Sequence, residues 1–252
     1  LSENIQAILT STSFASVSFQ DGFDDTQIWD KLKLPILQLL SSTKSKSAWL
    51  KNTSGLDPID LTMQVVLPEL DGRITTRPCA FKEFKENNEN LCTAVEELVP
   101  YDLGIEWVCK YLTNLIKLKQ TDNCKKVICI ILANYPVTNA RIANGVGLDT
   151  PESLYQILNW LYLEGYDLGE NFRPSSGIDL IKEILSSRTN DPVSLDLNPL
   201  TYLSLERYNN WFKSLSKDIQ KQLTEKWGEP SNSKELENKG FAIHGIRKGN
   251  IY

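Results

Sequence analysis

The stretch LPELDGRI, residues 67–74, places two acids and one base around a turn that follows an apolar run. Glu69 and Asp71 are the candidate catalytic residues, and Glu69 is also a candidate transient metal ligand. A carboxylate close to a ligand can accept a proton or receive a hard divalent cation, and Arg73 can bind an acidic group. The alternative is a plain turn with solvated acids, which composition alone favours.

A second candidate site is the loop NARIANGVGLDTPES, residues 139–153. Its glycines allow close backbone approach or positive φ, and the amides that begin the next helix can hold an anion such as a carboxylate. An arginine in the loop can clamp the same group through two N–H donors. The alternative is an ordered surface loop before a well-capped helix. The candidate substrate-binding residues are Arg73 and, in this loop, Arg141, Asn144, Gly145, Gly147 and Asp149.

Several other kinds of site are not predicted. The loop has neither GxGxxG nor GK[ST], so nucleotide binding is not expected there. His244 is the single histidine, which rules out a polyhistidine metal site within this sequence, and no GxSxG motif supports a serine triad. We assign His244 no role. The five cysteines are widely spaced without a CxxC pair, which indicates a reducing, cytoplasmic setting rather than a disulfide or zinc framework.

The composition is that of a globular protein. The 252 residues are 41% hydrophobic and 23% charged, enough for one large or two ordinary domains. A net charge of -5 argues against nucleic acid or an anionic membrane as a partner. No apolar run approaches the roughly 20 residues of a membrane span, and the first residues do not resemble a signal peptide.

In the first third of the chain we expect strands and short helices in alternation. Residues 5–14 and 34–40 read as strands, the second buried on both faces, and a short helix surrounds Trp49. After Asp57 and Pro58 a helical start signal competes with an alternating, strand-like apolar pattern, and we favour the helix.

Two prolines limit the elements that follow. Pro68 is expected to end the helix that begins after Asp57. Residues 73–81 are expected to form a strand at a sheet edge, because Pro78 lacks an N–H to donate.

The remaining sequence predicts a helical connector and a second piece. Residues 84–124 read as the connector, with a clear helix over 105–119. A buried strand that begins at about residue 125 and ends at Asn134, a helix after Pro151 capped by Thr150, a helix over 216–228 and a β-like end follow.

This order predicts an α/β fold made of two Rossmann- or flavodoxin-like parallel-sheet pieces. The expected boundaries are 1–83 for the piece with LPELDGRI, 84–124 for the connector, and 125–252 for the piece with the loop. The chain begins at Leu1 and stops within a β-like stretch, so we expect an internal fragment whose second piece is truncated.

Three stretches of the sequence are long and distinctive. GLDPIDLTMQVVLPELDGRITTRPCAFKE, residues 55–83, resembles the large subunit shared by cobaltochelatase and magnesium chelatase. ANYPVTNARIANGVGLDTPESLYQILNWLYLEGY, residues 133–166, resembles the cobalt branch, whereas the magnesium branch has a pattern such as FSFPPDKGNVGTAAYL there. The block from YLSLERYNNWF to FAIHGIRKGN is similar to the family's next segment.

The resemblance implies a tetrapyrrole-binding subunit of a metal chelatase, a ligase that inserts Co²⁺ as a substrate into hydrogenobyrinic acid a,c-diamide during cobalamin biosynthesis. It also implies two partners, an AAA+ ATPase subunit and an integrin-I-domain subunit, which use ATP and Mg²⁺ that this chain does not bind. The alternatives are a magnesium chelatase subunit acting on protoporphyrin IX and a non-catalytic tetrapyrrole-binding homologue. A fragment of this length is expected to be inactive alone.

Overall fold

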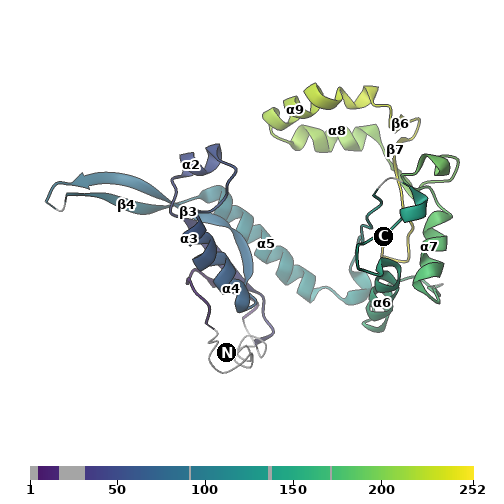
Figure 1. Ribbon diagram of the computed structural model, residues 1–252, viewed down its shortest axis with the longest axis horizontal. Coiled ribbons are helices and arrows are strands. Elements are labelled where there is room, and N and C mark those ends of the chain that lie inside the picture. Colours follow the sequence, from purple (N-terminus) through teal and green to yellow (C-terminus); the bar gives the residue numbers. More distant parts are fainter. Residues whose placement is uncertain (1–4, 17–31, 91, 136–137, 171) are drawn as a thin grey trace. The chain divides into compact units, whose positions relative to one another are not determined.

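The computed structural model describes residues 5–16, 32–90, 92–135, 138–170 and 172–252 (Figure 1). The chain divides into two compact units, Leu1–Gln120 and Thr121–Tyr252, called unit 1 and unit 2 below. Each unit is described by itself. Within the described ranges, no helix has the length and apolar character needed to cross a membrane.

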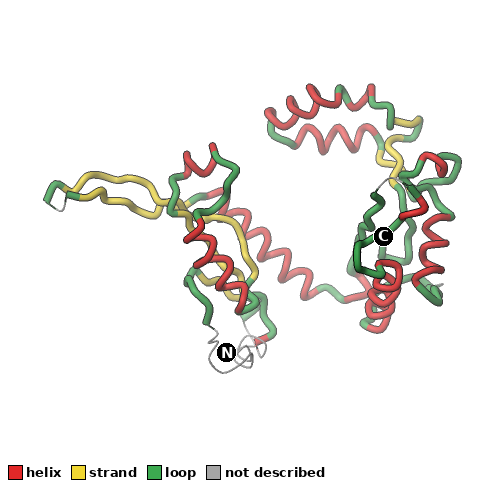
Figure 2. Tube along the Cα trace, in the orientation of Figure 1, coloured by secondary structure: helices red, strands yellow, loops and turns green. Residues whose placement is uncertain are grey.

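Unit 1 contains a four-stranded sheet in the order β1-β2-β3-β4 (Figure 2). The first three strands run parallel and β4 runs antiparallel to β3, so the predicted α/β class with a parallel sheet is confirmed. β2 is the buried central strand that its apolar run predicts, with Leu37 fully buried. The strands are β1 (Ile8–Thr10), β2 (Ile36–Ser42), β3 (Ile74–Asn88) and β4 (Thr93–Pro100).

Along the chain, the helices of unit 1 lie between β2 and β3 and after β4. α2 includes the predicted Trp49, and α5 confirms the helix predicted over 105–119 and extends it. The helices are α2 (Lys46–Lys51), α3 (Pro58–Leu61), the π-helical turn η3 (Thr62–Val66), α4 (Leu67–Leu70) and α5 (Asp102–Gln120).

The helical choice for residues 58–70 is confirmed, but the expected stop at Pro68 is wrong. The Asp57 carboxylate accepts a hydrogen bond from the Ile59 amide at 3.1 Å, as a helix N-cap does. In η3 the backbone shifts to wider hydrogen bonds, and the Leu67 amide donates to the Thr62 carbonyl. Pro68 then sits in the first turn of α4, where a missing N–H is tolerated.

The edge position predicted for residues 73–81 is also wrong, because β3 lies between β2 and β4. Pro78 faces Leu40 at a point where the strand register shifts. A bulge of this kind accommodates a residue that cannot donate to the ladder.

The predicted helical connector is a β-hairpin over its first half. β3 continues to Asn88, and β4 pairs with it from Ala80↔Pro100 to Asn88↔Thr93. Cross-strand ion pairs join Lys82 to Glu96 and Lys85 to Glu97 at 2.6 and 2.9 Å. Both faces of this hairpin are largely solvent-exposed, so its sequence lacks the apolar alternation that marks a half-buried strand.

Unit 2 is also mixed α/β, but its three-stranded sheet, β5-β7-β6, is antiparallel, not parallel as expected. The strands are β5 (Thr201–Leu203), β6 (Leu236–Glu237) and β7 (Gly240–Ile243). The helices are α6 (Thr150–Leu163), α7 (Gly177–Leu185), α8 (Leu205–Ser214) and α9 (Lys217–Trp227), with short 3-10 turns η4 (Asn123–Lys125), η5 (Asn139–Arg141), η6 (Pro192–Ser194) and η7 (Pro230–Asn232).

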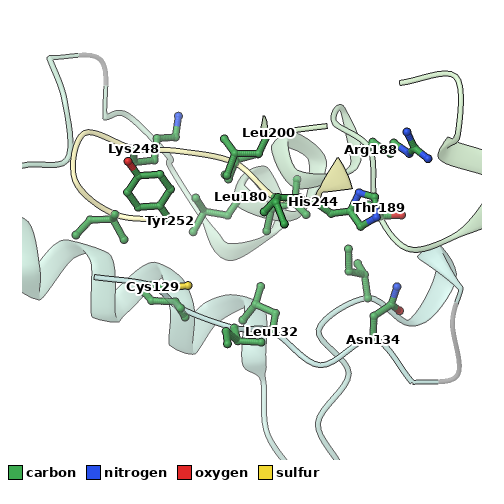
Figure 3. A pocket seen from close by; sticks show the side chains of 18 of the residues that line it. Cys129, Leu132, Asn134, Leu180, Arg188, Thr189, Leu200, His244, Lys248 and Tyr252 are labelled. Atoms are coloured by element: carbon green, nitrogen blue, oxygen red, sulfur yellow. The ribbon is translucent and has the colours of Figure 1, made fainter. Parts of the chain in front are cut away.

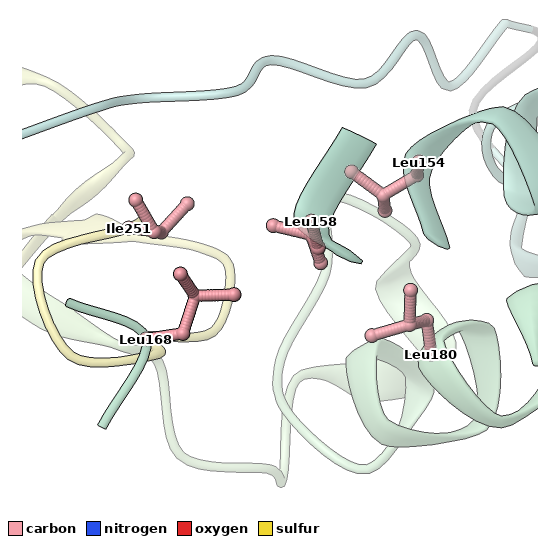
Figure 4. Packing of buried hydrophobic residues seen from close by; sticks show 5 residues of the cluster. All are labelled: Leu154, Leu158, Leu168, Leu180 and Ile251. Carbon is pink, nitrogen blue, oxygen red and sulfur yellow. The ribbon is translucent and has the colours of Figure 1, made fainter. Parts of the chain in front are cut away.

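The buried strand expected to end at Asn134 is not a strand of a sheet: among the described residues 126–135, the parallel bridge Ile128↔Ile251 is the ladder contact that forms. The Ile130 amide donates to the Tyr252 carbonyl at 2.8 Å, but Ile131 is 89% exposed. The inward face of this segment packs on the core of unit 2, formed by Leu154, Leu158, Leu168, Leu180 and Ile251 (Figure 4).

Two helices of unit 2 begin and end largely as predicted. α9 is capped by Ser216 and ends at Gly228, which has a φ of 78°. The cap of α6 is Asp149, not Thr150, because the Asp149 carboxylate accepts from the Glu152 amide at 3.0 Å.

Candidate functional site

Asp71 and Arg73 form a buried ion pair in unit 1. The Arg73 Nη2 atom lies 2.7 Å from the Asp71 Oδ2 atom, and the side chains are 3% and 0% exposed. Arg73 Nη1 also donates to the Thr12 carbonyl, just after β1, at 2.9 Å and to Gln38 Oε1 on β2 at 3.0 Å. The pair therefore lies inside the fold.

The same pair ties down the segment that follows β1. The Asp71 carboxylate accepts from the Ser16 amide at 2.8 and 2.9 Å, and Arg73 Nη2 donates to the Ser16 hydroxyl at 2.8 Å. Asp71 and Arg73 thus brace the turn after α4 against Thr12–Ser16.

Glu69 has a different environment. It is exposed on α4, where its Oε1 atom accepts a hydrogen bond from the Thr75 hydroxyl at 3.1 Å. Of the two predicted catalytic carboxylates, Glu69 is the one that faces solvent, and Asp71 is the one held by an arginine.

A second buried polar group in unit 1 was not singled out from the sequence. Asp60 on α3 accepts from the Thr43 amide at 2.8 Å, and the Gln64 side chain donates to it at 3.1 Å. Gln64 also exchanges hydrogen bonds with the backbone of Ser41. These hydrogen bonds connect the helical stretch 58–70 to the carboxyl end of β2. The sequence signal that could have identified them is a polar residue at a position where the helix faces the core.

The predicted loop of unit 2 folds around a depression that its own residues line. A depression of about 340 Å³ is lined by Arg141, Asn144, Gly145 and Asp149, together with apolar neighbours. Four of the predicted substrate-binding residues are therefore gathered around one space, and Gly147, with a φ of 75°, lies in the turn beside them without lining it.

The amides that begin α6 are already occupied. The Glu152 amide donates to the Asp149 carboxylate, the Ser153 amide donates to the Asp149 carbonyl at 2.9 Å, and Pro151 has no N–H. The expectation that these amides hold an anion is therefore wrong, because the capping carboxylate takes that place. Arg141 remains the cation of the loop.

The loop is anchored from a distant segment. The Asp191 carboxylate accepts from the Asn139 amide at 2.6 Å and from the Val193 amide at 3.0 Å. These backbone hydrogen bonds lower the pKa of Asp191. The Thr189 hydroxyl donates to the Asn139 side chain at 2.7 Å. Sequence reasoning missed both anchors, which lie about 50 positions from the loop.

Unit 2 also contains a larger, mainly apolar cavity of about 580 Å³ (Figure 3). Its walls come from the extended segment 129–132, from α6 and α7, and from residues 242–246. His244, given no role from the sequence, lies on this wall. Its pKa is lowered, first by burial and then by the positive charge of Arg188, so the imidazole is neutral at pH 7.

In the parts of the chain that the structure covers, no three histidine, cysteine or acidic side chains lie together in a group that could hold a metal ion. The five cysteines are free thiols.

Comparison with known proteins places these sites in context. A sequence profile of the CobN/Magnesium Chelatase family matches residues 1–252. The aerobic cobaltochelatase subunit CobN of Pseudomonas aeruginosa is 36% identical over 217 residues, which cover 86% of this chain and 17% of that protein. The magnesium-chelatase subunit ChlH of Oryza sativa subsp. indica is 24% identical over 253 residues, covering 98% of this chain and 17% of that protein.

A solved structure agrees with the sequence comparison. The catalytic subunit of cobaltochelatase from Mycobacterium tuberculosis superimposes with a TM-score of 0.77 at 26% identity, covering 98% of this chain and 21% of that one. The chain thus spans about a fifth of the length of the relatives it matches. Because the family profile matches along the whole sequence, this chain belongs to the CobN/magnesium chelatase family.

Proposed function

We propose that this chain is part of the tetrapyrrole-binding large subunit of an ATP-dependent cobaltochelatase, which inserts Co²⁺ into hydrogenobyrinic acid a,c-diamide. The observation that carries the proposal is that this chain is more similar to a cobaltochelatase subunit than to a magnesium-chelatase subunit. Identity is 36% to the CobN subunit of Pseudomonas aeruginosa and 24% to the rice ChlH subunit. The sequence of the loop between 133 and 150 follows the cobalt branch as well.

The partners we propose are an AAA+ ATPase subunit and an integrin-I-domain subunit, which would hydrolyse ATP with Mg²⁺. The lack of a GK[ST] motif in this sequence supports that division of labour. We place the assembly in the cytoplasm, since five free thiols suit a reducing compartment.

Metal insertion replaces two pyrrole N–H protons by one divalent cation. A carboxylate beside the ring can accept a proton and guide the cation, and Glu69 is our first choice because it is exposed on α4. Asp71 is the second choice, because its carboxylate is already bound to Arg73. In this scheme the main contribution of Asp71 and Arg73 is to hold the turn that carries Glu69.

The loop residues would bind the substrate's acidic side chains. Arg141 can donate two N–H groups to a carboxylate, and Asn144 can donate its amide. Gly145 and Asp149 would shape the depression, since a Cβ atom on Gly145 would lie 2.8 Å from the Thr150 hydroxyl oxygen, and Gly147 would allow the turn beside it through its positive φ.

The experiment is a Co²⁺-insertion assay with the protein from its complete open reading frame and both partner subunits. Glu69→Gln keeps the size and hydrogen-bonding ability of the side chain but cannot accept the proton. We expect its insertion rate to fall by about 10²-fold or more. The matched control is Glu86→Gln, an exposed carboxylate on the β3–β4 hairpin, which should insert at the wild-type rate.

Two results would count against the proposal. Insertion at the wild-type rate by Glu69→Gln would remove Glu69 from the mechanism. Insertion of Mg²⁺ into protoporphyrin, without insertion of Co²⁺ into the corrin precursor, would move the protein to the magnesium branch.

A further inference from the structure

Three buried polar side chains gather in the segment that follows α7: Thr189, Asp191 and Ser194, called the 189–194 cluster below. They bind one another. The Ser194 hydroxyl donates to the Asp191 carbonyl at 2.7 Å, and the Asp191 amide donates to the Thr189 hydroxyl at 3.1 Å. Buried polar groups need hydrogen-bond partners, and these internal bonds keep the cluster in one arrangement.

The 189–194 cluster holds Asn139, the first residue of η5, at two points. The Asp191 carboxylate accepts from the Asn139 amide at 2.6 Å, and the Thr189 hydroxyl donates to the Asn139 side-chain oxygen at 2.7 Å. The backbone and the side chain of Asn139 are therefore both fixed. Arg141 follows two positions later in the same turn.

A second fixed point lies just after Arg141. The Ala143 amide donates to the Ala133 carbonyl at 2.8 Å, and Ala143 is buried with a φ of 59°. A left-handed backbone is unfavourable for alanine and persists only where the surrounding structure imposes it. Arg141 thus lies between two held residues, and the strain at Ala143 would be released if the loop came loose from the 189–194 cluster.

The Arg141 side chain is exposed and lines the depression of about 340 Å³. A long exposed side chain has many rotamers, so the directions open to its guanidinium depend on the backbone that carries it. A backbone that is already fixed lowers the cost of ordering this side chain around a ligand. The hydrogen bonds to Asn139 are therefore placed where they can change the affinity of the depression.

We infer that Asp191 is a positioning residue for ligand binding by the loop: through Asn139 it holds Arg141 ready to receive an acidic side chain of the ring. The inference rests on the proposed function, in which Arg141 binds such a group. It adds to that function a residue from outside the loop. Asp191 acts through Arg141 and makes no contact with the ring in this scheme.

The carboxylate of Asp191 serves two amides with separate oxygens. Oδ2 accepts from the Asn139 amide and Oδ1 from the Val193 amide. Asparagine has one acceptor oxygen and would present its NH₂ donor to the other amide, so Asp191→Asn breaks one of these bonds at nearly constant size. The loop then populates other conformations, and the affinity falls with the fraction that remains competent to bind.

The test is a double-mutant cycle with the protein from its complete open reading frame. Fluorescence quenching by hydrogenobyrinic acid a,c-diamide gives the dissociation constant for the wild type, Asp191→Asn, Arg141→Met and the double variant. We expect Asp191→Asn to weaken binding by about tenfold when Arg141 is present, the factor that one lost charge-assisted hydrogen bond represents. In the Arg141→Met background the same change should weaken binding by less than about twofold. A loss of folded protein alone would act equally in both backgrounds.

The Co²⁺-insertion assay with both partner subunits provides a second readout. Asp191→Asn should raise KM for the ring and leave kcat unchanged, because it weakens binding in the ground state and the transition state alike. Asp196→Asn makes the same change at an exposed position in the same segment and should change neither constant.

A second pair of variants reaches the same anchor without altering Asp191. Thr189→Val removes the hydroxyl that donates to Asn139 and keeps the branched shape of the side chain. It should weaken binding in an Arg141-dependent way, and Thr189→Ser, which restores the hydroxyl, should recover the affinity. This pair decides the question if Asp191→Asn does not fold.

Each result has one meaning. An unchanged affinity, or an equal loss in the two backgrounds, overturns the positioning role and leaves the proposed function standing. Wild-type affinity in Arg141→Met also overturns that role, since Arg141 then does not hold the ring. Failure of the folded wild type to bind the ring overturns the proposed function, and the positioning role with it.

Discussion

The Arg73 guanidinium lies 2.7 Å from the Asp71 carboxylate, and the two side chains are almost completely buried. They are two residues apart in the sequence, but their other partners, Thr12, Ser16 and Gln38, are 35 to 61 positions away. The acidic and basic residues of the LPELDGRI turn therefore hold unit 1 together, and only Glu69 of the three is exposed.

Breaking this pair should destabilise unit 1 strongly. Arg73→Met leaves the Asp71 carboxylate buried without its cation, and removing one partner of a buried pair costs about 3–5 kcal/mol. Denaturant unfolding of the protein measures the loss. The control is Lys82→Met, whose ion pair with Glu96 has both side chains more than 40% exposed. Its loss should be about 1 kcal/mol or less. Equal losses for the two variants would show that the Arg73 pair does not hold the fold.

Much of unit 1 could be predicted because its signals are local. β2 is a short apolar run, and the helix after Asp57 starts with a capping side chain and a proline. The stop at Pro68 was wrong because a π-helical turn, which has no sequence signature here, precedes it. The hairpin over 84–100 was missed because its residues are charged and exposed on both faces.

The candidate site was predictable only where it is contiguous in sequence. Arg141, Asn144, Gly145 and Asp149 come together because they belong to one loop. Asp191, which anchors that loop through Asn139, is 52 positions away, and no single-sequence pattern joins the two. The anion site at α6 failed for a local reason, because Asp149 is both a candidate residue and the helix cap.

The Asp191 anchor predicts a pH dependence. Two backbone amides lower the pKa of Asp191 below its usual value of 3.8. The unfolded chain then binds this proton at a higher pH than the folded protein does. The stabilisation is thus fully present above pH 3.8 and is lost as pH falls through the folded-state pKa. Asp191→Asn should lower the free energy of unfolding at pH 7, and the difference from the wild type should shrink below pH 3.8.

Thermal melts at several pH values check this dependence. Asp196→Asn, at an exposed position in the same segment, should leave the melting temperature nearly unchanged at each pH. A deficit in Asp191→Asn that stays constant down to the most acid pH would mean that the charge of Asp191 does not contribute.

Gly104 marks a close approach of α5 to β3. A Cβ atom at this position would lie 2.0 Å from the Pro78 carbonyl oxygen, so an alanine forces the helix away from the strand. Alanine gains about 1 kcal/mol of helix propensity over glycine, and we expect the overlap to outweigh it with a net loss of about 1–3 kcal/mol. Asn114→Ala, on an exposed face of α5, should be neutral or slightly stabilising in the same denaturant measurement. A stabilised Gly104→Ala variant would contradict the tight contact.

The reactivity of the cysteines tests the packing of α5 on β3. Burial raises the pKa of the Cys79 thiol on β3, and the neighbouring Cys109 on α5 raises it further. Since the thiolate is the reacting form, Cys79 should react with iodoacetamide at pH 8 more slowly than the exposed Cys92 and Cys124. Mass spectrometry of peptides over time measures the rates. In denaturant all three should react at similar rates, because burial is lost. Equal rates in the folded protein would contradict the contact between β3 and α5, whereas a slow Cys79 that becomes fast in Gly104→Ala would locate the contact at Pro78.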